Sequence, residues 1–204
     1  MAKSGPGRGT VDGGPRGERM GMKHGIFLAG HGGQGILFAG KLLAYAAGII
    51  EGRQVLWLPS YGASVRGGTA NCSVIISEDR IRAPILEQPD SLVFFNQESA
   101  DRFASLVGPE SAVLWDSAAV TRAPWNGSPR ARAVPLDHLA KTFENRMVAN
   151  VIMLGALIAL HPVVSARAVA TALGETMKGK KEKVLADNLQ ALEIGQQWAQ
   201  AKEG

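Results

Sequence analysis

The residues best suited to contact a ligand or a partner lie between positions 60 and 76, where an arginine stands among glycines. Tyr61-Gly62 precedes Arg66, and Gly67-Gly68 follows it directly. Glycine lets a backbone approach another molecule closely, and the planar guanidinium of arginine donates paired hydrogen bonds to carboxylates and phosphates. A strand-forming run, Cys72 to Ile76, comes next. This pattern predicts a loop that meets a ligand or another subunit.

A second glycine-rich segment, Gly30-His31-Gly32-Gly33-Gln34-Gly35, separates an apolar run from a helix-like sequence. It satisfies the pattern G-x-G-x-x-G, which turns a strand into a helix beside a bound anion. We expect the helix to begin at about Gln34, with its free amide groups and positive dipole end forming an anion site. The alternative is that these glycines only let the helix and the sheet pack closely.

The chemistry that should accompany such a turn in an enzyme is incomplete. NAD and FAD sites need an acidic residue at the end of the second strand, but that strand ends here in Leu58-Pro59-Ser60. No Gly-Lys-Ser/Thr follows the glycines, and no nucleophile elbow, H-E-x-x-H pattern or carboxylate cluster is present. The chain therefore has loops that can approach a ligand but lacks a set of groups to react with it. This favours a subunit or binding module over an enzyme acting alone.

Single residues whose side chains could take part in a reaction are more simply explained by structural roles. His31 is expected to be an exposed loop residue and Trp57 to pack. Asp116 ends a strand near the expected crevice, and helix capping explains its position equally well. Cys72, the one cysteine, is expected to be a small buried hydrophobe. A lone cysteine excludes a disulfide within the chain and an iron–sulfur cluster ligated by this chain alone, and we expect no metal site.

Composition describes an ordinary globular protein. The 204 residues are 46% hydrophobic and 20% charged, and much of the net charge of +4 comes from the first 21 residues. The rest is too weakly basic for a nucleic-acid-binding protein. The most apolar helix, about 147–160, is too short to cross a bilayer, and no secretory signal is visible. We expect a cytoplasmic protein with no membrane contact.

The pattern along the chain predicts two parts. Residues 1–22 contain seven glycines and two prolines and are expected to be a disordered Gly/Arg-rich tail, with Met20 or Met22 as an alternative start. Residues 23–204 are expected to be a single α/β domain: Rossmann-like, with a mostly parallel sheet flanked by helices and a helical C-terminal part. Predicted strands are 25–30, 54–58, 72–77, 91–95, 112–115 and 132–134; predicted helices are 34–48, 97–106, 146–160, 166–174 and 180–202.

Three details of this prediction can be checked against the structure. Pro59 is expected to end the second strand, since proline cannot stand inside a central ladder. Ser165 is expected to cap the helix that follows it. The last helix is expected to bury a face formed by Leu185, Leu189 and Leu192.

Two motifs in order give a specific resemblance: Gly-His-Gly-Gly-Gln-Gly at 30–35 and Leu-Pro-Ser-Tyr-Gly-Ala-Ser-Val-Arg-Gly-Gly-Thr-Ala-Asn-Cys at 58–72, followed by Val-Ile-Ile-Ser at 74–77. Over residues 24–198 the chain resembles the gamma subunit of 2-oxoacid:ferredoxin (2-oxoacid:acceptor) oxidoreductases. Ile81, Pro84, Pro89-Asp90, Asn96 and Ala149-Asn150-Val151 also fit. The Pro-Ser-Tyr-Gly form is closer to the 2-oxoglutarate and 2-oxoisovalerate types than to the indolepyruvate type.

The resemblance implies a complex that oxidatively decarboxylates a 2-oxoacid with coenzyme A, giving an acyl-CoA, CO2 and reduced ferredoxin. Thiamine diphosphate and Mg²⁺ are expected between the alpha and beta subunits, and iron–sulfur clusters on beta or on a ferredoxin-like subunit. The gamma chain is expected to support this chemistry through a Rossmann-like fold packed on the catalytic subunits. It would bind no cofactor alone and would not be catalytic in isolation.

Site roles follow from the resemblance as hypotheses. Gly30 to Gly35 would form the turn at the crevice, and Tyr61 to Gly68 a loop reaching the alpha/beta interface. Arg66 would contact a partner carboxylate or the phosphates of coenzyme A, or else hold the loop through an ion pair within the chain. Two other functions stay open: a stand-alone NAD- or FAD-binding oxidoreductase, and a free-standing module that binds coenzyme A or another anion.

Overall fold

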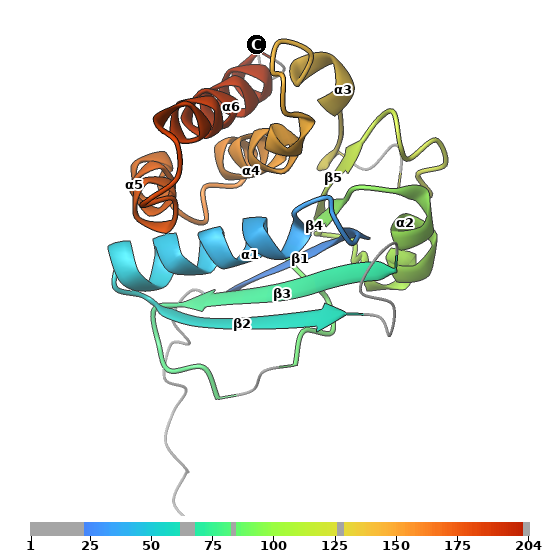
Figure 1. Ribbon diagram of the computed structural model, residues 1–204. Coiled ribbons are helices and arrows are strands. Elements are labelled where there is room, and N and C mark those ends of the chain that lie inside the picture. Colours follow the sequence, from blue (N-terminus) through green and yellow to red (C-terminus); the bar gives the residue numbers. More distant parts are fainter. Residues whose placement is uncertain (1–22, 62–67, 83–84, 126–128, 202–204) are drawn as a thin grey trace, which may run out of the picture.

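The computed structural model describes residues 23–61, 68–82, 85–125 and 129–201 (Figure 1). The predicted disorder of residues 1–22 and the predicted contacts of Arg66 and Gly67 lie outside these ranges. Nothing in the described residues therefore tests these three predictions.

The described part of the chain is built on a six-stranded sheet in the order β2-β3-β1-β4-β5-β6. Neighbouring strands β1, β4, β5 and β6 are parallel, and β3 is antiparallel to both β1 and β2. Five strands thus run in one direction and β3 alone runs in the other. The predicted α/β fold with a mostly parallel sheet is confirmed. The strands are β1 (Lys23–His31), β2 (Gln54–Tyr61), β3 (Thr69–Ser77), β4 (Ser91–Phe94), β5 (Ala112–Asp116) and β6 (Ala131–Val134).

Helices cover the two faces of the sheet unequally, as Figure 1 shows. Alternate strand residues such as Ile26, Cys72 and Val93 pack beneath α1, α4, α5 and α6, while Phe27 and Phe94 pack against α2. This alternation is what a strand buried on both faces requires. The helices are α1 (Ile36–Tyr45), which continues as the π-helix η1 (Ala46–Ile50), α2 (Gln97–Phe103), the 3₁₀ turn η2 (Ala104–Leu106), α3 (Leu136–Leu139), the 3₁₀ turn η3 (Arg146–Val148), α4 (Ala149–Leu160), α5 (Ala166–Thr176) and α6 (Glu182–Gln200).

The sequence predicted most element positions and missed some boundaries. Ser165 caps α5 by accepting from Ala168 N at 3.2 Å, as predicted. Pro59 does not end its strand, because β2 is the edge strand and needs no second ladder partner there. The first helix begins at Ile36 rather than at Gln34. None of the described helices is long and apolar enough to cross a membrane.

The leucine face predicted for the last helix is only partly confirmed: Leu192 is buried and Leu185 packs against the core, but small residues make the closest helix contact. Leu189 is 37% exposed, whereas Ala191, Gly195 and Ala199 are buried. A Cβ on Gly195 would lie 2.0 Å from Ile152 O, and one on Gly155 would lie 2.2 Å from Leu192 O. Helices α4 and α6 therefore meet backbone to backbone. Glycine is required at both positions because any side chain would separate the helices.

We predict that Gly195→Ala lowers the free energy of unfolding by about 2 kcal/mol, because the added methyl group collides with a backbone carbonyl that cannot move alone. Gly174→Ala is the matched control, since a Cβ there meets no described atom within 4 Å in helix α5. It should raise stability slightly, through helix propensity. Urea denaturation of both variants measures the difference. Equal stability in the two variants would contradict the tight helix crossing.

Two histidines lie near each other at the amino edge of the sheet. His24 Nε2 is 3.1 Å from Ser91 Oγ, and Gly25 N donates to Asp90 Oδ2 at 2.6 Å. His161 follows the end of α4. Burial lowers the pKa of both histidines, and that of His161 falls to about 4, with Arg130 adding to the effect. The fold therefore favours neutral imidazole at this edge.

A folded-state pKa below the ordinary 6.5 means that the unfolded chain binds more protons at acid pH. Stability from His161 is fully present above about pH 6.5 and is lost as the pH falls toward about 4. We predict that the unfolding free energy decreases over this window and that His161→Gln flattens the decrease. His138→Gln, at an exposed position, is the control. Denaturation midpoints at pH 7, 6, 5 and 4 test this, and identical pH profiles for wild type and His161→Gln would contradict it.

Candidate functional site

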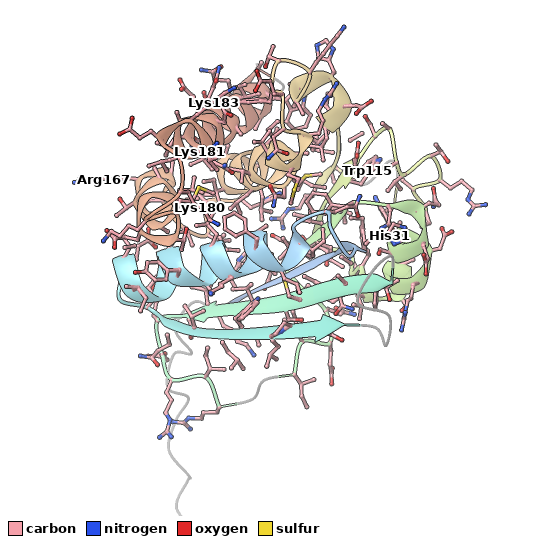
Figure 2. The ribbon with its side chains drawn as sticks, viewed as in Figure 1. His31, Trp115, Arg167, Lys180, Lys181 and Lys183 are labelled. Atoms are coloured by element: carbon pink, nitrogen blue, oxygen red, sulfur yellow. The ribbon has the colours of Figure 1, made fainter. Side chains whose placement is uncertain are left out.

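The neighbouring parallel strands β1 and β4 are connected onward to opposite sides of the sheet. From β1 the chain passes through α1 to β2 on one side, and from β4 it passes through α2 to β5 on the other. Open α/β sheets bind ligands at such a point, outside the carboxyl ends of the strands. Here the glycine turn after β1 faces the segment that begins α2, and Figure 2 places His31 beside that helix.

The glycine turn needs glycine at particular positions. Gly33 and Gly35 have φ values of 98° and 76°, a left-handed conformation that other residues rarely adopt. Gly35 is the N-cap of α1, which explains why the helix starts later than predicted. A Cβ on Gly30 would lie 2.6 Å from Gln34 Oε1 and 2.9 Å from Phe95 Cβ. The turn is therefore fixed by close packing on one side and by backbone conformation on the other.

Gln34 ties the turn to the neighbouring strand and helix. Its Oε1 accepts from His31 N at 2.6 Å and from Asn96 Nδ2 at 3.2 Å, and its Nε2 donates to Phe95 O at 3.1 Å. Asn96 in turn caps α2 by accepting from Ser99 N at 2.8 Å. The side-chain amide of Gln34 thus uses both of its polar atoms within the protein.

The two glycine motifs meet directly. Gly32 N donates to Gly68 O at 2.9 Å, and His31 pairs with Thr69 in the β1–β3 register. Tyr61 is the last residue of β2 and pairs with Ala70. Residues 62–67 lie outside the described residues, so the predicted positions of Arg66 and Gly67 are untested. The structure nevertheless brings both described ends of the arginine loop to the edge that carries the glycine turn.

Asn150 holds the turn from the opposite side, a role that the sequence analysis did not assign. Its Nδ2 donates to Gly35 O at 3.1 Å, and the residue is only 4% exposed. A Cβ on Gly35 would lie 2.0 Å from this nitrogen. The available signal was a lone amide within the otherwise apolar sequence of α4, because a buried polar group requires a partner.

The other residues considered as candidates, His31, Asp116 and Cys72, make contacts within the protein or lie in its core. His31 is the last residue of β1 and only partly exposed, so its predicted place in an exposed loop is wrong. Its Nδ1 lies 3.8 Å from Glu98 Oε2. Burial raises the pKa of Asp116, and its Oδ1 accepts from Ala118 N at 3.1 Å within a turn. No described helix begins at this point, so the helix-capping role expected for Asp116 is wrong. Burial raises the pKa of the Cys72 thiol to about 12, so this cysteine is an inert core residue as predicted.

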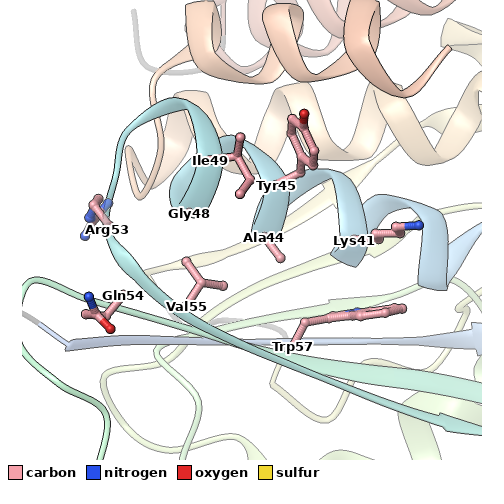
Figure 3. A pocket seen from close by; sticks show the side chains of 9 residues that line it. All are labelled: Lys41, Ala44, Tyr45, Gly48, Ile49, Arg53, Gln54, Val55 and Trp57. Carbon is pink, nitrogen blue, oxygen red and sulfur yellow. The ribbon is translucent and has the colours of Figure 1, made fainter. Parts of the chain in front are cut away.

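A pocket of about 440 Å³ lies elsewhere, along the second half of α1, η1 and β2 (Figure 3). Exposed Ile49 and the side chains of Tyr45 and Trp57 form its apolar part. The Arg53 guanidinium at one end already has partners within the protein: its Nε lies 3.0 Å from Glu78 Oε1, and its Nη1 donates to Val163 O at 2.5 Å. This depression lacks convergent reactive groups. Across the described ranges no group of three or more His, Cys, Asp or Glu residues is placed to hold a metal ion.

The geometry argues against the dinucleotide alternative. In a dinucleotide site the amides of the glycine turn point to the pyrophosphate, and the second strand lies next to the first. Here the Gly32 amide is used by Gly68 O, and β3 separates β2 from β1. The end of β2 is therefore two strands away from the turn.

Comparison with known proteins decides the family. The model of the pyruvate ferredoxin/flavodoxin oxidoreductase family matches residues 25–198, which include both glycine motifs and Asn150. The chain belongs to this family. The resemblance noted from the two sequence motifs is thereby confirmed.

Three relatives resemble this chain either along their whole length or over about a third of it. Ketoisovalerate oxidoreductase subunit VorA of Methanothermobacter thermautotrophicus is 40% identical over 85% of this chain, but the match spans only 36% of VorA. The gamma subunit of a keto/oxoacid ferredoxin oxidoreductase from Geobacter sulfurreducens is 32% identical, with a TM-score of 0.76 over 88% of this chain and 98% of its own. The third is the 2-oxoglutarate:ferredoxin oxidoreductase of Magnetococcus marinus, solved with 2-oxoglutarate, coenzyme A and succinyl-CoA. It is 27% identical, with a TM-score of 0.80 over 90% of this chain and 32% of its own.

We predict that Asn150→Ala lowers the unfolding free energy by about 2 kcal/mol, because it leaves the Gly35 carbonyl without its buried donor and opens a small cavity. Asn145→Ala is the control: Asn145 is exposed, and its Oδ1 accepts from Met147 N at 3.0 Å. That control should cost no more than about 1 kcal/mol, typical of a lost cap. Chemical denaturation compares the variants. An Asn150→Ala protein as stable as wild type would contradict the role assigned to this contact.

Proposed function

We propose that this chain is the gamma subunit of a 2-oxoacid:ferredoxin oxidoreductase. The complex would oxidatively decarboxylate a 2-oxoacid with coenzyme A, giving an acyl-CoA, CO2 and reduced ferredoxin. The observation that carries the proposal is the correspondence with the Geobacter gamma subunit over 98% of that chain, together with the family match. The meeting of the glycine turn with Gly68 supports a shared contact surface at the carboxyl edge of the sheet.

Within this proposal the chain supports the chemistry and partner chains carry it. Thiamine diphosphate and Mg²⁺ would lie between alpha and beta subunits, and iron–sulfur clusters on beta or on a ferredoxin-like subunit. The only cysteine, Cys72, is enclosed beneath α1 with a raised thiol pKa, so this chain does not fit an iron–sulfur cluster. Ferredoxin would be the acceptor, and a cytoplasmic location stays a prediction.

The contact surface would include Gly30, Gly32, Gly33, Gln34 and Gly35 of the turn, together with Tyr61, Arg66, Gly67 and Gly68 of the arginine loop. Arg66 is proposed to reach a partner carboxylate or the phosphates of coenzyme A. Exposed backbone at Gly32 and Gly33 supports a close approach from outside. The solved Magnetococcus relative, which holds coenzyme A, makes the coenzyme the first ligand to test.

The substrate would be a branched-chain 2-oxoacid or 2-oxoglutarate. VorA and the Magnetococcus enzyme, named for these two acids, are the relatives that support this choice. The pocket that selects the acid is expected on other chains. A stand-alone NAD- or FAD-binding oxidoreductase is disfavoured because Gly68 already uses the Gly32 amide.

Affinity purification from the native cell tests the proposed function. The tagged chain should copurify with thiamine-binding subunits, and the complex should reduce viologen in a reaction that needs both a 2-oxoacid and coenzyme A. A panel of 2-oxoacids then names the substrate. A chain that purifies without such partners, or with a bound nucleotide, would contradict the proposal.

We predict that Arg66→Ala leaves the isolated chain folded but lowers kcat/KM for coenzyme A about 10-fold in the complex, because a charge-assisted hydrogen bond is lost. Arg167→Ala, on the exposed surface of α5 (Figure 2), is the control and should retain full activity. Steady-state assays of the purified complexes compare the two variants. Unchanged kinetics in Arg66→Ala would leave only the intrachain role for this arginine.

A further inference from the structure

Gln34 is placed to control how the two glycine motifs meet. The backbone amide of His31, held by Gln34 Oε1 at 2.6 Å, immediately precedes the Gly32 amide that donates to Gly68 O at 2.9 Å. A second contact, from Gln34 Nε2 to Phe95 O at 3.1 Å, fixes the amide group itself against the end of β4. The orientation of the Gly32 amide therefore depends on a side chain anchored in the neighbouring strand.

We propose that Gln34 is a positioning residue that fixes Gly68, the described end of the arginine loop, for the contact with coenzyme A. This inference rests on the proposed function, in which Gly68 belongs to the surface that meets the coenzyme. Gln34 itself touches no ligand in this scheme. It acts by holding His31 and Gly32 in the conformation that pairs with β3.

Close packing of Gly30 against Phe95 and the hydrogen bond from Asn150 to Gly35 O hold the two ends of the turn. Gly32 and Gly33 are exposed, and a Cβ on Gly33 would meet no described atom within 4 Å. Glycine at φ 98° also gives the backbone freedom to relax once a restraint is removed. The hydrogen bonds of Gln34 therefore restrain the middle of the turn, between those two contacts.

The restraint is local. The hydrogen bonds of the Gln34 side chain are to His31, Phe95 and Asn96 at the edge of the sheet. The paired strands β1 and β3 continue below the turn from Gly30↔Ala70 to Lys23↔Ser77. Losing Gln34 should thus free the turn and leave the strands paired.

Hydrogen–deuterium exchange on the isolated chain tests the geometric part. Gln34→Met keeps the side-chain length and removes all three hydrogen bonds, so the Gly32 amide should exchange about 10-fold faster while β4 and β5 stay protected. Gln34→Glu keeps an acceptor for His31 N but loses the donor to Phe95 O, and its exchange should be intermediate. Gln197→Met, at an exposed position whose amide bonds only Glu193, is the control.

Kinetics of the complex test the functional part. Gln34→Met should raise KM for coenzyme A about 5-fold or more, with kcat and the KM for the 2-oxoacid within about twofold of wild type, because only one binding contact is displaced. Gln34→Glu should recover part of this loss, and Gln197→Met should match wild type. A general folding defect would instead lower kcat through a smaller active fraction.

Two results would overturn the inference: unchanged exchange of the Gly32 amide in Gln34→Met, or faster exchange with an unchanged KM for coenzyme A. The failure of the proposed function is separate, because it would show as a wild-type protein that forms no coenzyme-A-dependent complex. That result would remove the coenzyme part of the inference, and the exchange experiment would still decide whether Gln34 positions Gly68.

Discussion

The antiparallel pairing of β3 with β1 is the constraint on which the candidate site depends. It carries the end of the arginine loop back beside the glycine turn and allows Gly32 N to bond Gly68 O. The same pairing moves β2 to the edge of the sheet, two strands from the turn. The G-x-G-x-x-G pattern is typical of dinucleotide binding, where an amide of the turn would bind a pyrophosphate. Here the Gly32 amide donates to Gly68 O instead.

Two side-chain amides, one buried and one partly buried, complete this arrangement. Gln34 lies in the turn and bonds His31 N and Phe95 O. Asn150 lies in α4 and donates to Gly35 O. Each hydrogen bond is worth only about 1 kcal/mol, but an unpaired buried amide costs more. Such groups therefore specify one arrangement of the turn more than they stabilise the fold. The helices that bring Asn150 into place depend on the close crossing of α4 and α6 at Gly155 and Gly195.

The chemistry of the described residues agrees with a supporting subunit. Cys72 has a thiol of high pKa in the core, Asp116 caps a turn, and Arg53 is held by Glu78 and a carbonyl of the α4–α5 connection. These groups serve the fold. Among the described residues of the two glycine motifs, Gly32 and Gly33 are exposed and leave backbone open to a partner or coenzyme.

Sequence by itself determined the α/β class, the six strands, the helical C-terminal part and the family, because apolar periodicity and two ordered glycine motifs are local signals. It also determined that Cys72 is a core residue, since that residue stands in an apolar strand. Only the tertiary structure decided that Pro59 lies inside a strand and that Leu189 is exposed. It alone also decided that Asn150 bonds Gly35 and that Gln34 bonds Phe95. The physical reason is that edge position, helix crossing and buried hydrogen bonds depend on residues far apart in the chain: Asn150 and Gly35 are separated by 115 positions. No local pattern records such a pairing.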